Sequence, residues 1–387
     1  MKKNILLLAI FLLATIASEA LAIPAFARKY SMTCKTCHSP FPRLKEYGEE
    51  FAGNGFILKD KEAPRFFMET GDEELSLIRD FPLAMRIEGY ITQNHEQSKG
   101  PDLYVPHSFK ILSGANLGGN VAYYLYYILE EGKPGKLEDA FILFSDVLGS
   151  GLGAAIGQFQ VCDPIAKREL RLSRDDYMIL KAHPGSSGIS LAYDRGVMLT
   201  YGLPTGTDLV FQVVNGNGIG STLAFDNFDS DKHKNFFVMA MQDVAGLFTV
   251  GGNVYIGKED MGAGASTVTS SVNMYGGNVV TSFGPFDLTG VYLFRKDKGT
   301  LVGPATGDIE TSGGFAELIY LPNGDDSKWY VGSLFNIIDS DDPATKLKTV
   351  SAFTGYQVRR NIRLTGEFRQ DLNNKYGMFA FGFVAAF

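Results

Sequence analysis

From Phe81 to the C-terminus, apolar residues alternate with polar or small ones in segments of about ten residues, and turn residues separate the segments. A period of two is the pattern of β-strands, whose successive side chains point to opposite faces. The pattern predicts sixteen strands. They cover residues 81–94, 107–117, 121–130, 136–147, 151–161, 189–201, 208–214, 234–244, 247–257, 268–283, 286–295, 309–321, 328–338, 347–358, 362–370 and 375–387.

The connections between these segments alternate between short and long. Connections after even-numbered strands are short, as at 118–120, 245–246 and 284–285, whereas most of the others are longer. Bacterial outer-membrane barrels have an even strand number, short periplasmic turns and longer outer loops. A soluble β-sandwich, the alternative, has no reason to keep this phase. We therefore predict an all-β transmembrane barrel over residues 81–387, porin-like, with about 16 antiparallel strands.

The last segment supports a barrel. Four phenylalanines at positions 379, 381, 383 and 387 fall on one face of the strand, and small or aliphatic residues fall on the other. An aromatic outer face that ends in Phe is typical of the closing strand of an outer-membrane barrel. In a soluble protein the same strand would expose a long apolar edge, which favours aggregation. The predicted location is therefore the cell outer membrane, with outer-membrane lipid around the barrel.

The longest connection, at residues 162–188, admits two interpretations. It carries a group of charged side chains: Lys167, Arg168, Arg171, Arg174, Asp175 and Asp176. A loop at this position can fold into the polar lumen of a porin, which accepts such charges. It can equally lie in solvent outside the barrel.

The N-terminus and the composition place the chain outside the cytoplasm. Residues 1–22 have a basic start, an apolar run and a small-residue cleavage site, which together predict a secretory signal peptide. Beyond it, no apolar run reaches the ~20 residues of a membrane helix. The high counts of 44 Gly, 18 Tyr and 29 Phe suit a barrel, and the net charge of −7 argues against nucleic acid as a partner.

Residues 34–38 read Cys34-Lys35-Thr36-Cys37-His38. This C-x-x-C-H arrangement is the attachment motif of c-type haem: two thiols on one turn bind the haem covalently, and the histidine is the proximal iron ligand. A redox or zinc pair is the alternative, but no βαβ pattern surrounds the motif and Cys162 is the only further cysteine. We predict one covalent haem c on Cys34 and Cys37, with His38 as its axial ligand.

The haem motif lies in a segment that is too short to be a stable domain by itself. Residues 23–80 separate the predicted cleavage site from the first strand, and a unit of this size buries little surface. We expect a monohaem cytochrome segment with one or two short helices that plugs the barrel or packs against its periplasmic mouth.

The N-terminal segment resembles the fused monohaem cytochrome–porins of bacterial outer membranes, a family that includes outer-membrane iron oxidases. The resemblance rests on AFARKY at 25–30, the motif at 34–38, FPRL at 41–44, YGEEF at 47–51 and NGF at 54–56. It covers roughly residues 22–56, and beyond them it concerns architecture alone. It implies that the haem lies in or at the barrel and carries electrons across the membrane, since lipid offers no redox relay.

The resemblance also implies a methionine on the distal face of the haem, which raises the reduction potential relative to two histidines. Met68 is our choice for this ligand, with gap-filling core packing as the alternative. Met85, which lies in the first strand, and His95 and His107, which lie near the first outer loop, remain alternatives, as does an open iron site.

The expected function is electron transfer between an extracellular donor such as Fe(II) and periplasmic electron-transfer proteins. If Fe(II) is the donor, the protein is an Fe(II) oxidase; otherwise it is an electron-transfer protein without an enzymatic activity of its own. Reduction of extracellular metals by the reverse flow uses the same architecture. A solute porin with a haem-bearing structural plug is the alternative from a different class. Carboxylate groups at Asp226, Asp229 and Asp231 and at Asp339, Asp341 and Asp342 either attract cations at the outer mouth or are ordinary solvated turns.

Overall fold

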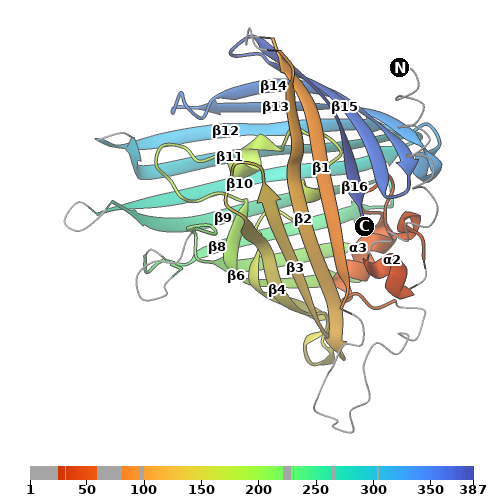
Figure 1. Ribbon diagram of the computed structural model, residues 1–387. Helices are drawn as coiled ribbons and strands as arrows, with labels where there is room; N and C mark the ends of the chain where they lie inside the picture. Colours follow the sequence, from red (N-terminus) through yellow and green to blue (C-terminus); the bar gives the residue numbers. More distant parts are fainter. Residues whose placement is uncertain are drawn as a thin grey trace.

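The computed structural model describes residues 25–30, 32–58, 81–95, 100–220, 228–229, 231–262, 267–302 and 305–387. Within them, sixteen antiparallel strands form one closed barrel in which each strand pairs with its sequence neighbours and β1 pairs with β16 (Figure 1). The strands are β1 (Leu83–Asn94), β2 (Asp102–Gly118), β3 (Val121–Glu130), β4 (Lys136–Phe144), β5 (Leu152–Gln160), β6 (Tyr193–Leu203), β7 (Thr207–Val214), β8 (Asn235–Val244), β9 (Phe248–Met261), β10 (Val268–Phe283), β11 (Phe286–Val302), β12 (Ala305–Tyr320), β13 (Trp329–Ser340), β14 (Leu347–Arg359), β15 (Ile362–Asp371) and β16 (Tyr376–Ala386). The predicted fold class is confirmed for the barrel.

The helices are short. They are α2 (Ala25–Tyr30) and α3 (Glu46–Gly53), with the 3₁₀ turns η1 (Cys34–Thr36), η2 (Val147–Gly149), η3 (Arg168–Leu170), η4 (Met178–Lys181) and η7 (Gly324–Asp326). Among the described residues, no helix is long and apolar enough to cross a bilayer.

Short turns gather at one end of the barrel, which we call the turn end. One of them joins β8 to β9 through Ala245 and Gly246, whose φ angles of 54° and 69° are left-handed, as the tight turns between antiparallel strands require. The closing pair β1–β16 meets at the same end, where the backbone N–H of Phe387 donates to the carbonyl oxygen of Met85 at 2.8 Å. The opposite end, which we call the loop end, carries the longer connections.

The two faces of each strand differ as a membrane barrel requires. In β8, for example, Phe237 and Met239 are buried toward the lumen, whereas Phe236 and Val238 are exposed on the outer surface. In β16, Phe379 and Phe381 are exposed and Ala380 is buried, which confirms the predicted aromatic outer face. An apolar exterior is what a barrel presents to lipid, so the predicted outer-membrane location agrees with the fold.

Three predicted strand starts were wrong by four or five residues, those of β2, β6 and β12, and β12 begins at Ala305 rather than at residue 309. β2 begins at Asp102 rather than at residue 107, because Pro106 lies where the pairing with β1 is interrupted, between Glu88–Ser108 and Tyr90–Tyr104. Such an irregularity tolerates a proline, which cannot donate to the ladder. β6 begins at Tyr193 rather than at residue 189, since the four preceding residues belong to the loop before it.

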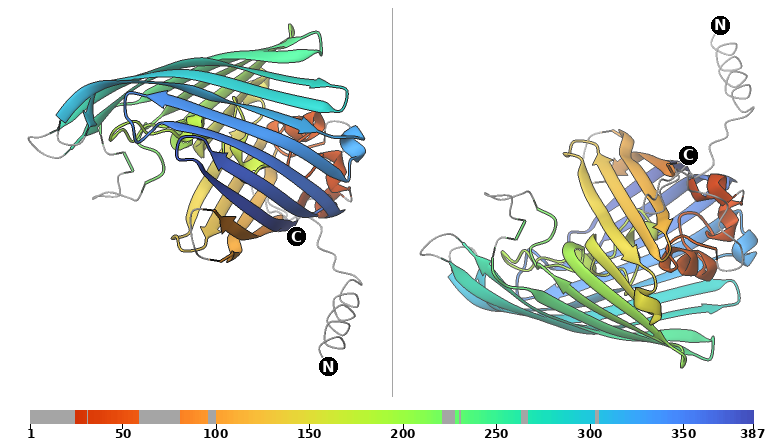
Figure 2. Two further views of the ribbon diagram at one scale, coloured as in Figure 1. Left: turned by 90° about the horizontal axis from the view of Figure 1, so that it is seen from above. Right: turned by 90° about the horizontal axis from the view of Figure 1, so that it is seen from below.

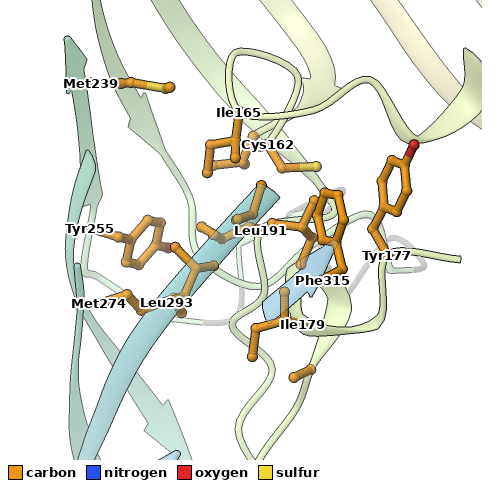
Figure 3. Close-up of a cluster of buried hydrophobic side chains, with 14 of the residues drawn as sticks. Cys162, Ile165, Tyr177, Ile179, Leu191, Met239, Tyr255, Met274, Leu293 and Phe315 are labelled. Carbon is orange, nitrogen blue, oxygen red and sulfur yellow. The ribbon is translucent and has the colours of Figure 1, made fainter. Parts of the chain in front are cut away.

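The loop between β5 and β6, residues 161–192, folds into the lumen, and we call it the inner loop (Figure 2). Its apolar side chains pack against the inner face of the wall at β8 to β12. Figure 3 shows Ile179 and Leu191 of the loop beside Phe315 and Leu293 of the wall, and the rings of Tyr177 and Phe315 stack with centroids 4.0 Å apart. This apolar cluster fills one side of the lumen. Of the two interpretations of this loop, the folded-in one is therefore correct.

The segment 25–58 lies against the turn end of the barrel (Figure 1). Lys45 forms an ion pair with Asp325 at 2.5 Å, and the Ser39 hydroxyl donates to the carbonyl oxygen of the same residue at 3.1 Å. Lys35 pairs with Asp326, the neighbouring residue of the β12–β13 connection, and Arg43 pairs with Asp287 at the start of β11. These contacts attach the segment to the barrel directly.

Candidate functional site

The C-x-x-C-H residues form one tight turn. The Thr33 hydroxyl accepts from the backbone N–H of Lys35 at 3.0 Å and caps η1. The backbone N–H of His38 donates to the carbonyl oxygen of Cys34 at 2.8 Å, so Cys34, Cys37 and His38 share one turn. Both thiols are free of disulfides. This is the arrangement that covalent attachment of a haem requires.

The His38 ring is oriented by the chain that follows it. Its Nδ1 atom lies 2.8 Å from the carbonyl oxygen of Pro42 and 3.3 Å from that of Arg43. Burial lowers the pKa of His38, although the two carbonyl oxygens favour its protonated form. A neutral imidazole that donates Nδ1–H to a carbonyl leaves Nε2 as the ligating nitrogen. The donor set therefore fits a haem iron.

An aromatic cluster adjoins the turn. Phe51 and Phe56 are buried, and Phe26 contacts both with ring centroids at 5.1 Å and 4.9 Å. Cys37 packs against this cluster, and Tyr124 of β3 joins it from the barrel wall. Because hydrophobic surroundings and limited solvent access raise or tune haem potentials, the cluster is the apolar environment that such a cofactor needs.

The second axial ligand stays a prediction, because Met68 lies outside the described residues. The structure places all three alternative residues, and the ring of His95 packs on that of Phe379 with centroids 5.6 Å apart, at the loop end of β1. Met85 is on the face of β1 opposite to Arg86, which lines the lumen, so Met85 points outward. His107 lies in β2, nine residues from Asn116, whose side chain is near Gly55 of segment 25–58. At about 3.3 Å per residue this is roughly 30 Å along the strand.

Charged side chains of the inner loop form buried ion pairs and hydrogen bonds with the barrel wall at β1 to β3. The Glu169 carboxylate is 3.2 Å from Lys110 Nζ and 3.6 Å from Arg86 Nη2, and it accepts a hydrogen bond from the Tyr126 hydroxyl at 2.9 Å. Burial opposes ionisation of Glu169, but Lys110 and nearby arginines hold its pKa well below the ordinary value. On the loop itself, Arg168 pairs with Asp176 at 2.6 Å.

A narrow polar cavity of about 320 Å³ remains between the inner loop and the wall of β1 to β4 and β15 to β16. Its lining runs from Pro42, which holds His38, to His107 and Glu130 near the loop end. Sequence reasoning missed this cavity. Arg86 and Glu88 are two apart and alternate with the apolar Met85 and Ile87, and that spacing was the available signal for an inward charged face.

The two groups of aspartates order turns. Asp231 accepts the backbone N–H groups of His233 at 2.6 Å and of Asp260 at 2.9 Å, and Asp342 accepts that of Gly185 at 3.0 Å. Asp226 lies outside the described residues. Across the part of the chain that the structure describes, no three such side chains converge as a metal site.

Together, the sixteen-strand barrel, its apolar exterior and the loop folded into its lumen define a porin-type fold. The anion-selective porin from Comamonas acidovorans is similar, with a TM-score of 0.56 and 11% identity over 80% of this chain and 99% of that one. The outer membrane channel DcaP of Acinetobacter baumannii gives a TM-score of 0.56 at 12% identity, over 80% and 97% of the two chains. OmpT of Vibrio cholerae gives 0.55 at 10%, over 79% and 96%.

No protein-family model and no curated protein sequence matches the chain. These three solved structures share only 10 to 12% of residues with it, so they establish the fold and leave the role of the Cys34–His38 turn to be tested.

Proposed function

We propose that this barrel is an outer-membrane electron-transfer protein that carries one c-type haem on Cys34 and Cys37, with His38 as proximal ligand. The observation that carries the proposal is the turn itself: two free thiols and a histidine held by the Pro42 carbonyl, on a segment fixed to the turn end of a closed barrel. When bound, such a haem supplies one-electron redox chemistry.

The contacts of the segment support this role. Ion pairs of Lys45 with Asp325 and of Lys35 with Asp326 fix the turn at the mouth, where a soluble periplasmic partner can approach. The polar cavity begins beside Pro42 and runs toward the loop end, so the neighbourhood of His38 faces the lumen as well. Fe(II) is the extracellular donor that we propose, and a periplasmic electron-transfer protein is the acceptor.

Vesicles that contain the purified holoprotein and trap a soluble cytochrome c inside test this function. External Fe(II) added without oxygen should reduce the trapped cytochrome, as followed by its absorbance. The Cys34→Ala/Cys37→Ala double variant should abolish this reduction because it cannot attach haem. Equal reduction with both proteins, or none with a haem-loaded wild type, would overturn the proposal.

Solute conduction is the second candidate, and the similarity to porins favours it. The polar cavity beside the inner loop is the observation that supports it, since its charged lining suits ions rather than lipid. Steady ion conductance of the full-length protein in planar bilayers would support this candidate. A sealed barrel would favour the electron-transfer role.

A further inference from the structure

The polar cavity is positively charged although the chain as a whole has a net charge of −7. Its lining holds nine lysines and arginines against five aspartates and glutamates. The basic residues are Arg86, Lys110, Lys133, Lys136, Arg168, Arg171, Arg174, Lys181 and Arg363, and the acidic ones are Glu88, Glu130, Glu138, Glu169 and Asp176. Low-dielectric walls around one sign of charge concentrate counter-ions, so the cavity attracts anions.

Most of these cations already have carboxylate partners. Arg86 and Lys110 pair with Glu88 at 3.0 Å and 3.2 Å and share Glu169 as well. A second group gathers on Asp176, which pairs with Arg168, Arg171 and Lys181 at 2.6 Å, 3.7 Å and 3.1 Å, and the pairs Lys133–Glu130 and Lys136–Glu138 lie at 2.7 Å and 2.6 Å. These residues need no ligand.

Arg363 and Arg174 are different, because neither forms an ion pair with any described residue. Arg363 is only 5% exposed; its Nη1 donates to the Tyr330 hydroxyl at 2.8 Å, and its Nε has no hydrogen-bond partner among the residues that the structure describes. The guanidinium of Arg174 lies 5.4 Å from the centre of the Tyr90 ring, and its Nη1 contacts the Met378 sulfur at 3.8 Å. Its Nε is buried as well and has no hydrogen-bond partner in the described part of the chain.

A buried guanidinium with unmet donors is costly unless an anion or water completes it. Two oxygens of a carboxylate or phosphate match the planar fork of N–H groups that arginine presents. We propose that the lumen cavity binds small oxyanions of the phosphate or carboxylate class, with Arg174 and Arg363 as their principal ligands. The aromatic rings of Tyr90 and Tyr330 hold these two guanidinium groups in place without neutralising them. The site uses no residue of the Cys34–His38 turn and does not depend on the proposed haem.

Isothermal titration of the purified full-length protein with inorganic phosphate, in a phosphate-free buffer, tests the proposal. Saturable binding is expected for the wild type. Arg363→Gln and Arg174→Gln should each weaken it by roughly tenfold or more, as the loss of a charged hydrogen bond predicts, and the double variant should abolish it. Arg363→Lys keeps the charge and should retain part of the affinity.

Arg359→Gln is the matched control, because Arg359 is an exposed residue at the turn end of β14, outside the cavity. It should bind phosphate like the wild type. Folding of every variant is checked by the mobility of unheated and heated samples on gels. No binding by the folded wild type, or equal binding by the double variant, would overturn the proposal. Water molecules would then be the hydrogen-bond acceptors of the two guanidinium groups.

Discussion

A methyl group at position 48 tests how tightly α3 packs on the Cys34–His38 turn. Gly48 is buried in the first turn of α3, and a Cβ atom there would lie 2.5 Å from the carbonyl oxygen of Cys37 and 2.9 Å from a side-chain carbon of Leu44. The oxygen belongs to the backbone, so it cannot rotate away. Gly53, in the last turn of the same helix, has no atom within 4 Å of such a Cβ.

The difference between Gly48→Ala and Gly53→Ala isolates this contact. Both substitutions reduce the entropy cost of a helical glycine, whereas only the first overpacks the site, at a cost of about 1 to 3 kcal/mol. If segment 25–58 opens locally, its open population should be roughly 5- to 150-fold larger in Gly48→Ala than in Gly53→Ala.

Limited proteolysis of the folded protein in detergent measures this population when reclosing is faster than cleavage. Cleavage within residues 25–58, identified by mass spectrometry, should be faster for Gly48→Ala by that factor, while the barrel stays intact. Equal cleavage rates for the two variants would refute the packing of α3 on Cys37.

Further predictions concern the inner loop. Leu180→Ala removes a fully buried side chain of the apolar cluster and should destabilise loop docking by about 2 to 5 kcal/mol. Proteolysis of residues 161–192 should therefore be faster in this variant. The control Leu148→Ala, at a 99% exposed position, should leave the proteolysis rate unchanged. Burial raises the pKa of Asp163; Lys167 lowers this pKa and Glu169 raises it further. A raised pKa means that the charged form of Asp163 is less stable in the docked loop than in the undocked loop. Docking should therefore weaken above roughly pH 4, the ordinary pKa of Asp. Asp163→Asn should therefore slow proteolysis of the loop at pH 8 but not below pH 4, and the same gain at both values would contradict this sign.

The barrel was predictable because every strand must present apolar side chains to lipid on its outer face, and the strand register fixes which residues those are. A one-residue slip would turn all outward apolar side chains inward, so alternation such as Phe379, Ala380, Phe381 identifies both a strand and its faces. Strand ends were less predictable where a strand continues through polar residues, which do not show the apolar alternation. β11 continues to Val302, past the predicted 295, through polar residues; one of them, Lys296, pairs with Glu310 of β12.

The candidate site was predictable only where it is local in sequence. Cys34, Cys37 and His38 are contiguous, so their chemistry can be recognised without a fold. Arg363 and Arg174 are far apart in the chain and reach one cavity only because the barrel closes and the inner loop folds into it. The sequence showed the charges of that loop but not which of them would find a carboxylate partner.

The intact mass of the mature protein, purified from the outer membrane of cells that mature c-type cytochromes, tests most directly whether a haem is attached to this barrel. We predict the mass of the processed chain plus one haem for the wild type, and the unmodified chain for the Cys34→Ala/Cys37→Ala variant. A wild-type protein that carries only the unmodified mass would contradict the haem assignment and leave a porin-type barrel with a structural plug.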